Sequence, residues 1–159
     1  MSSSIYLEKK RLRLRYAKLG DLETLFCWAN EQTAKWAYFD RKNISFQEHS
    51  KWFKSVLSDK KVIVWIFGQI DIDVGVVRYN RTNGNFRISF YIDKPYRRLG
   101  LATLMLNKSL DKITKKFPGI PITAEVREGN AASVQALLKV GFEVSMKNSK
   151  TIYLIRDIH

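Results

Sequence analysis

A short glycine-containing turn between a strand pattern and a helix pattern is the feature that most constrains how this chain can fold. Before the turn, residues 86–92 are rich in β-branched and aromatic side chains, which predicts a strand. After it, residues 101–113 carry apolar side chains at helical spacing, which predicts a helix. The first N–H groups of a helix have no partner inside the helix, and the helix dipole is positive at that end. The turn at residues 97–102 therefore predicts a site for an anion.

Two interpretations of this turn stay open on its six residues alone. In the first, Gly100 lets the backbone approach a phosphate closely, Ala102 leaves the helix start unobstructed, and Arg97 and Arg98 supply positive charge, so that the turn cradles a pyrophosphate. In the second, the turn is an ordinary basic loop before a surface helix. A single glycine between arginines does not decide between them.

Composition limits the class of protein. A chain of 159 residues fits one domain, expected to span residues 1–159, and 45% hydrophobic content excludes a disordered chain. With one cysteine, Cys27, and two histidines, we expect neither a disulfide framework nor a metal cluster. The first residues do not resemble a signal peptide, and no apolar run predicts a membrane span. We therefore expect a cytoplasmic protein.

The formal net charge of +13 favours acidic partners, such as nucleic acid, an anionic membrane surface or a phosphorylated small molecule. The basic residues are scattered along the chain, which also fits a simple solvated surface. Zinc-finger spacing, basic-zipper patterns and aromatic RNA-binding signatures are missing from the sequence, so nucleic acid is not the expected partner.

The remaining patterns predict a mixed α/β sheet flanked by helices. Strands are expected at residues 11–17, 62–67, 74–79, 86–92, 122–126, 142–146 and 151–155, and helices at 21–30, 45–57, 101–113 and 130–140. Residues 45–48 read Ser-Phe-Gln-Glu, a capping box for the second of these helices. Residues 31–44 are rich in aromatic side chains but are predicted to be irregular.

Two segments, taken together, resemble the GNAT superfamily of acyl-coenzyme A-dependent N-acyltransferases. Arg97, Gly100 and Ala102 fit the Q/R-x-x-G-x-G/A pattern of that family, and residues 130–142 fit its N-x-x-(A/S)…G-F segment. The resemblance covers nearly the whole chain. It implies a mixed, mainly antiparallel central sheet with splayed central strands, and acetyl-coenzyme A as the acyl donor.

The N-terminal half resembles two branches of the superfamily. Residues 11–15 followed by Asp21 look like ribosomal-protein N-terminal acetyltransferases. Residues 28–30 and 44–53 are closer to enzymes that acetylate the amino group of a nucleotide-linked amino sugar, as in pseudaminic acid biosynthesis. The second resemblance implies acetyl transfer to such a sugar for polysaccharide biosynthesis, directly within a ternary complex.

Two other functions remain as alternatives. The first is acetylation of a protein N-terminus, and the second is a non-catalytic acyl-coenzyme A-binding or RNA-associated module. Whether two copies form a homodimer is left open.

The resemblance implies that the donor's pyrophosphate lies on the turn and that its pantetheine arm lies along the strand before it. The expected donor-binding residues are Ser89, Tyr91, Ile92, Arg97, Arg98, Leu99, Gly100, Leu101, Ala102, Thr103 and Asn130. Asn130 also fits a plain helix N-cap.

Two residues are the expected catalytic groups. Glu125 fits an E-V-x-x-x-N segment of the amino-sugar subgroup, and strand alternation turns it away from Ala124 and Val126. It could act as a base through water, or it could be a surface carboxylate paired with a basic side chain. The subgroup resemblance gives His49 a role on the acceptor side, although a lone helical histidine can also be structural.

The acceptor is expected to contact Asn30, Trp36, Tyr38, His49 and Trp52, with packing in the core as the alternative for Trp52. Three positions depart from the family pattern. Leu137 stands where many relatives carry a proton-donating tyrosine, Arg87 where they often carry an acid, and Ala29 where the amino-sugar enzymes carry arginine. Cys27 is expected in the core, which favours direct transfer over a cysteine-bound intermediate.

Overall fold

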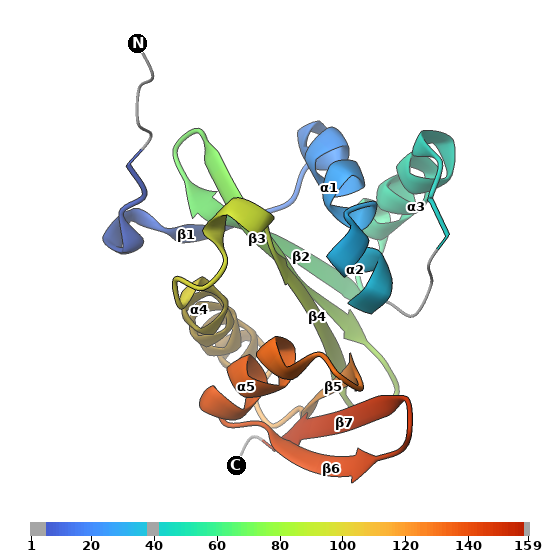
Figure 1. Cartoon of the computed structure of the whole chain (residues 1–159), viewed down its shortest axis with the longest axis vertical. Coiled ribbons are helices and arrows are strands. Elements are labelled where there is room, and N and C mark those ends of the chain that lie inside the picture. The colour runs from blue at the N-terminus through green and yellow to red at the C-terminus, as the bar shows by residue number, and fades with distance from the viewer. Residues whose placement is uncertain (1–5, 38–41, 158–159) are drawn as a thin grey trace.

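The computed structural model describes residues 6–37 and 42–157, which form one mixed sheet with helices on both faces (Figure 1). In this part of the chain the sheet has seven strands in the order β1-β2-β3-β4-β5-β7-β6. The strands are β1 Arg13–Tyr16, β2 Val62–Gln69, β3 Ile72–Arg81, β4 Phe86–Ile92, β5 Ile122–Arg127, β6 Glu143–Lys147 and β7 Thr151–Arg156. Neighbouring strands are antiparallel except β4 and β5, which are parallel. The expected fold class is confirmed.

The helices divide between the two faces of the sheet. Helices α1 Leu22–Ala29, α2 Gln32–Ala37 and α3 Phe46–Ser58 gather on one face, and α4 Leu101–Lys116 and α5 Ala131–Lys139 lie on the other (Figure 1). Adjacent residues of β2 point to opposite faces of the sheet. The buried Trp65 belongs to the core beneath α4 and α5, whereas its neighbour Ile66 packs beneath α1–α3. Each helix buries its apolar side against one of these two clusters.

The sheet opens between its two parallel strands. Pairing of β4 with β5 covers only Phe86–Ile88 against Ile122–Ala124. Past that point β4 remains paired with β3 as far as Ile92, and β5 remains paired with β7 as far as Arg127. The two halves of the sheet therefore diverge, and the β5-facing backbone groups of residues 89–92 have no β5 partner in the described sheet. This wedge is the splayed pair of strands that the family resemblance implied.

Several local predictions are confirmed. Ser45 and Glu48 form the expected capping box, in which the Ser45 hydroxyl accepts from the Glu48 N–H at 3.2 Å and the Glu48 carboxylate accepts from the Ser45 N–H at 3.0 Å. β4 has the predicted bounds, and the two strands at the end of the chain pair as a hairpin. Asn130 caps α5 by accepting from the Ser133 N–H at 3.3 Å.

Three local predictions are wrong. Residues 32–37 are helical instead of irregular, because Glu31 accepts a hydrogen bond from the Ala34 N–H and starts a short helix that has no usual N-cap residue. The first strand begins at Arg13, since a 3-10 turn over Lys9–Arg11 precedes it. Cys27 is exposed, because α1 turns Leu25 and Trp28 toward the sheet instead.

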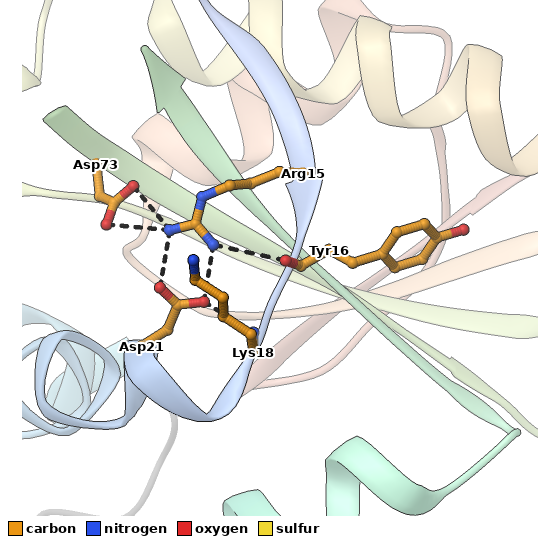
Figure 2. Close-up of polar contacts among 5 residues, drawn as sticks. All are labelled: Arg15, Tyr16, Lys18, Asp21 and Asp73. Atoms are coloured by element: carbon orange, nitrogen blue, oxygen red, sulfur yellow. Dashed lines mark hydrogen bonds and ion pairs between the residues drawn. The ribbon is translucent and has the colours of Figure 1, made fainter. Parts of the chain in front are cut away.

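An ion-pair cluster fixes the start of α1 on the sheet (Figure 2). Arg15 of β1 donates to both carboxylate oxygens of Asp21 at 2.7 and 2.8 Å, and it also reaches Asp73 of β3 at 3.1 Å. The Lys18 N–H donates to the same Asp21 carboxylate at 2.8 Å. Burial alone would raise the pKa of Asp21, but the hydrogen bonds from Arg15 and Lys18 outweigh it and lower that pKa. The cluster thereby holds the helix that carries Leu25 and Trp28.

Candidate active site

Two cavities meet on β4, and they share Ser89 and Tyr91 as lining residues. The first, which we call the wedge cavity, has a volume of about 480 Å³ and lies between the diverging strands, the turn before α4 and the start of α5. The second, which we call the α1–α3 cavity, has a volume of about 540 Å³ and lies beneath the N-terminal helices. Molecules bound in the two cavities would therefore both contact these two side chains.

The turn before α4 exposes helix N–H groups to the wedge cavity. Gly100 is the N-cap residue of α4 and adopts a left-handed conformation with φ of 73°. Arg98 has a φ of 62° and also lies in that region. A side chain other than glycine would be strained at Gly100, which explains the need for glycine at this position. The residues present thus fit an anion-binding turn.

Most of the residues expected to bind the donor line the wedge cavity. They are Ser89, Tyr91, Ile92, Arg97, Arg98, Gly100, Leu101, Ala102 and Asn130, whereas Leu99 and Thr103 do not line it. Leu137 is fully buried and contributes an apolar wall where a tyrosine was the family pattern. The guanidinium of Arg97 points to the α2 region, where its Nη2 lies 3.1 Å from Glu31 Oε2.

Sequence reasoning missed one basic residue at this turn. The ammonium of Lys9 lies 3.9 Å from the position that a Cβ on Gly100 would take. Lys9 belongs to the 3-10 turn before β1, far from Gly100 in the sequence. No local pattern could have paired the two, because their proximity depends on how β1 and α4 pack.

Glu125 lies on β5 at the edge of the wedge cavity. Ala124 and Val126 are buried on the opposite face, as strand alternation predicted, and the Glu125 side chain is 35% exposed. Arg87 Nη2 donates to Glu125 Oε2 at 3.0 Å, so the carboxylate has the basic partner that one interpretation expected. The ion pair does not remove Glu125 from the cavity, and both possible roles remain compatible with its position.

His49 lines the α1–α3 cavity and is only 2% exposed. Its Nε2 is buried without a hydrogen-bond partner among the described residues. Burial lowers the pKa of His49, against a smaller opposing effect of its hydrogen bond with the Leu22 backbone. The imidazole is therefore neutral at physiological pH.

Aromatic side chains form much of the α1–α3 cavity. Trp52 is 42% exposed, lines the cavity and carries the guanidinium of Arg78 at 5.3 Å from its ring centroid. Trp28 and Tyr91 lie deeper, with their ring centroids 5.5 Å apart. Burial raises the pKa of Tyr91 to about 12, so its hydroxyl stays protonated.

Among the described residues that line the α1–α3 cavity, the charged ones are mostly basic. They include the cations Lys35, Lys42 and Arg78 and the acidic Glu48. The Glu48 carboxylate is occupied by the Ser45 N–H and hydroxyl, each at 3.0 Å. These three cations were not singled out from the sequence, because basic residues are scattered along the whole chain and their convergence depends on the packing of α2 and β3.

The other residues expected to contact the acceptor have different surroundings. The Asn30 amide exchanges hydrogen bonds with the Ile44 backbone at 2.9 and 3.1 Å, which joins the end of α1 to the segment before α3, and Asn30 does not line the cavity. Trp36 belongs to α2, but its side chain is not described. Tyr38 lies outside the described residues.

Within residues 6–37 and 42–157, we find no group of three or more His, Cys, Asp or Glu side chains that could hold a metal ion. None of the helices in those ranges is both long and apolar enough to cross a membrane.

Residues 11–143 match the family model described as acetyltransferase (GNAT) domain. The chain belongs to the GNAT family. It is an acyl-coenzyme A-dependent N-acetyltransferase with acetyl-coenzyme A as its donor, and the wedge cavity with its anion-binding turn fits that molecule. No curated protein sequence matches the chain significantly.

Solved structures share the GNAT fold across nearly the whole chain. Spermidine N-acetyltransferase from Vibrio cholerae, in complex with CoA and spermine, is similar with a TM-score of 0.84 at 16% identity, covering 94% of this chain and 96% of that one. A domain from Methanocaldococcus jannaschii gives 0.81 at 18% identity, covering 92% and 98%. Aminoglycoside acetyltransferase AAC(6')-Ib, in complex with coenzyme A and kanamycin, gives 0.77 at 17% identity, covering 92% and 94%. At these identities the likeness concerns the fold.

Proposed function

We propose that this GNAT enzyme transfers an acetyl group from acetyl-coenzyme A to the amino group of a nucleotide-linked amino sugar. The observation that carries the proposal is the α1–α3 cavity, which combines aromatic side chains with three basic residues and joins the wedge cavity at Ser89 and Tyr91. A nucleotide-linked sugar presents a flat base, a negatively charged diphosphate and an amine on one molecule. The α1–α3 cavity has aromatic rings for the base and cations for the diphosphate, and the amine would face Glu125 in the wedge cavity.

The charge of the cavity disfavours polycationic acceptors. Spermine and kanamycin, which are bound to two of the similar structures, carry several positive charges at neutral pH. Lys35, Lys42 and Arg78 add positive charge to the wall that such an acceptor would meet. In a partly enclosed site repulsion between like charges is stronger than it would be in water. The same three cations attract a diphosphate.

The aromatic side chains support the nucleotide part of the acceptor. Trp52 is exposed enough to offer a ring face to a base, and stacking on aromatic rings is worth about 1–3 kcal/mol per base. Arg78, which lies over the Trp52 ring, adds a cation next to that face for a phosphate. His49 lines the same cavity and contributes a neutral ring to the wall that the sugar would meet.

Glu125 is the proposed base. Bound acetyl-coenzyme A supplies an activated acetyl thioester to the site. On the protein side, Glu125 lies at the edge of the wedge cavity and on the sheet face that carries Ser89 and Tyr91, so its carboxylate can accept the amine proton through a water molecule. Proximity of the two substrates supplies much of the remaining rate enhancement.

Protonation of the departing sulfur needs no dedicated side chain. Leu137 is apolar and cannot donate a proton, whereas a thiol with a pKa of about 8.5 leaves readily and takes a proton from water. Cys27 lines neither cavity, which agrees with direct transfer between two substrates bound at the same time.

A thiol-release assay with acetyl-coenzyme A tests the proposed substrate class. The panel contains UDP-linked amino sugars, the free amino sugars, a peptide with a free N-terminus, spermidine and kanamycin. We expect turnover with a nucleotide-linked amino sugar, and much lower rates once the nucleotide is removed. Preference for the peptide would support N-terminal acetylation, and coenzyme A binding without turnover of any amine would support a non-catalytic module; either result contradicts the proposal.

A variant of Arg78 makes the assay specific to the cavity. We expect R78Q to raise the KM of the nucleotide-linked sugar about 10-fold, because one charge-assisted hydrogen bond to a phosphate is lost. The control is K54Q, which removes an exposed cation of α3 that does not line the cavity. Equal effects of the two variants would show that only the overall charge of the protein matters.

A further inference from the structure

We propose that Arg97 is a positioning residue that holds α2 between the two cavities, instead of a ligand of the donor's phosphates. The family pattern gives Arg97 the first position of the phosphate-binding turn, but two of its hydrogen-bond partners lie elsewhere: Glu31 directly precedes α2, and Thr33 belongs to its first turn. The part of the proposal that concerns acceptor affinity rests on the proposed function of the α1–α3 cavity.

Each of the three nitrogens of the Arg97 guanidinium donates a hydrogen bond within the described structure. Nε donates to the Ile92 carbonyl at 2.9 Å, Nη1 donates to Thr33 Oγ1 at 3.3 Å, and Nη2 donates to Glu31 Oε2 at 3.1 Å. The guanidinium also lies over the Tyr91 ring, 5.2 Å from its centroid. These three partners fix one orientation of the planar guanidinium, and in that orientation the group faces α2.

Glu31 connects this fork to the backbone of α2. One carboxylate oxygen accepts from Arg97 and from the Ala34 N–H at 3.3 Å, and the other accepts from the Thr33 hydroxyl at 3.1 Å. Burial alone would raise the pKa of Glu31, but the hydrogen bonds from Thr33 and Arg97 outweigh it and lower the pKa. The carboxylate is therefore charged and completes a continuous connection from β4 to the first turn of α2.

Helix α2 needs such an external tie. It has six residues, and a helix of that length is not stable by itself in water. Yet it forms walls of both cavities, since Thr33, Ala34 and Ala37 line the wedge cavity while Lys35 lines the α1–α3 cavity. Release of the Arg97–Glu31 pair would therefore move a wall of the acceptor side without removing the turn that binds the donor's phosphates.

The test separates the two roles of Arg97 with variants of both partners. R97Q, E31Q and the double variant are compared for the Kd of coenzyme A by calorimetry, for hydrogen exchange of the α2 amides, and for KM and kcat with a UDP-linked amino sugar. We expect each variant to leave the coenzyme A Kd within about twofold, to speed α2 exchange at least 10-fold, and to raise the acceptor KM at least fivefold with little change in kcat. The double variant is expected to have the same effects as each single variant, because each single variant already breaks the connection between Arg97 and Glu31.

R98Q is the matched control for charge at the turn. Arg98 lines the wedge cavity next to Arg97 but forms no hydrogen bond or ion pair with α2 among the described residues, so we expect R98Q to weaken coenzyme A binding and to leave α2 exchange unchanged. If R97Q weakens coenzyme A binding as much as R98Q while E31Q changes nothing, Arg97 is a phosphate ligand and the proposal is overturned. Unchanged α2 exchange in R97Q and E31Q also overturns it.

The exchange and coenzyme A readouts do not depend on the acceptor. If none of the nucleotide-linked sugars is acetylated, the proposed function fails, and faster α2 exchange with an unchanged coenzyme A Kd still supports the positioning role. If the sugars are acetylated but E31Q leaves both KM and α2 exchange unchanged, the positioning role fails and the proposed function stands.

Discussion

Replacement of Gly100 by alanine tests the anion-binding turn, and the same replacement at Gly119, beyond the other end of α4, is its matched control. Gly100 at the start of α4 has a φ of 73°, and Gly119 just after its end has a φ of 74°. A Cβ at Gly100 would come no closer than 3.9 Å to Lys9 Nζ, and one at Gly119 would meet no described atom within 4 Å. Both substitutions are therefore free of collisions and differ only in whether the residue lies at the proposed donor site.

The magnitude follows from the backbone strain. An L-residue in the left-handed region costs about 1–2 kcal/mol, so G119A should lower stability by about that amount. For a chain of this size, that corresponds to a melting temperature about 2–8 °C lower. In free G100A the turn relaxes to a right-handed conformation, so this variant loses less stability than G119A, and coenzyme A must restore the strained conformation on binding. A cost of about 1–2 kcal/mol raises the coenzyme A Kd by a factor of about 5–30.

Calorimetric titration with coenzyme A and thermal unfolding by circular dichroism measure the two effects separately. We expect G119A to lose stability without loss of affinity and G100A to lose affinity with a smaller loss of stability. An unchanged Kd in G100A, with a melting temperature close to that of the wild type, would show that the turn does not bind the donor. A Kd raised equally in G119A would show a general effect of destabilising α4.

Three further variants test other parts of the account. E125Q should lower kcat about 100-fold with the coenzyme A Kd within twofold, because a positioned base is lost, and an unchanged pH–rate profile would remove Glu125 as the base. D21N should lower stability by about 2 kcal/mol at pH 7, because two charged hydrogen bonds from Arg15 are weakened. The folded pKa of Asp21 lies below its usual value of 3.8, so its contribution is present above about pH 4 and is lost below it; melting curves of wild type and D21N should converge there. The folded pKa of His49 also lies below its usual 6.5, so wild type should lose stability as the pH falls below about 6.5 and H49Q should not, and parallel pH dependence in both would contradict a buried neutral imidazole.

The local patterns of the sequence were sufficient for most of the fold. β4 and α4 follow from strong periodicity and a glycine turn, and the capping box of α3 uses two side chains three residues apart. Helix α2 was missed because Glu31 starts it with help from Arg97, a contact between residues far apart in the sequence. Cys27 was misjudged for a related reason, since only packing shows which side of a short apolar helix meets the sheet.

The candidate site also has some features that the sequence predicts and others that depend on how the elements pack. The turn at Gly100 and the strand position of Glu125 are local features, and the structure has both at the wedge cavity. The acceptor side combines residues from α2, α3 and β3, so Lys35 and Arg78 could not be distinguished from other surface cations in the sequence. Arg97 shows most clearly what the sequence could not predict. Its position in the motif suggests a contact with phosphate, whereas its hydrogen bonds connect it to Glu31 and Thr33.

A crystal structure of the protein with coenzyme A bound tests the central claim most directly. The account predicts the pyrophosphate on the N–H groups at residues 98–103, the pantetheine arm between β4 and β5, and the thiol next to Ser89 and Glu125. Coenzyme A bound elsewhere, or bound with its thiol remote from the junction of the two cavities, would contradict it.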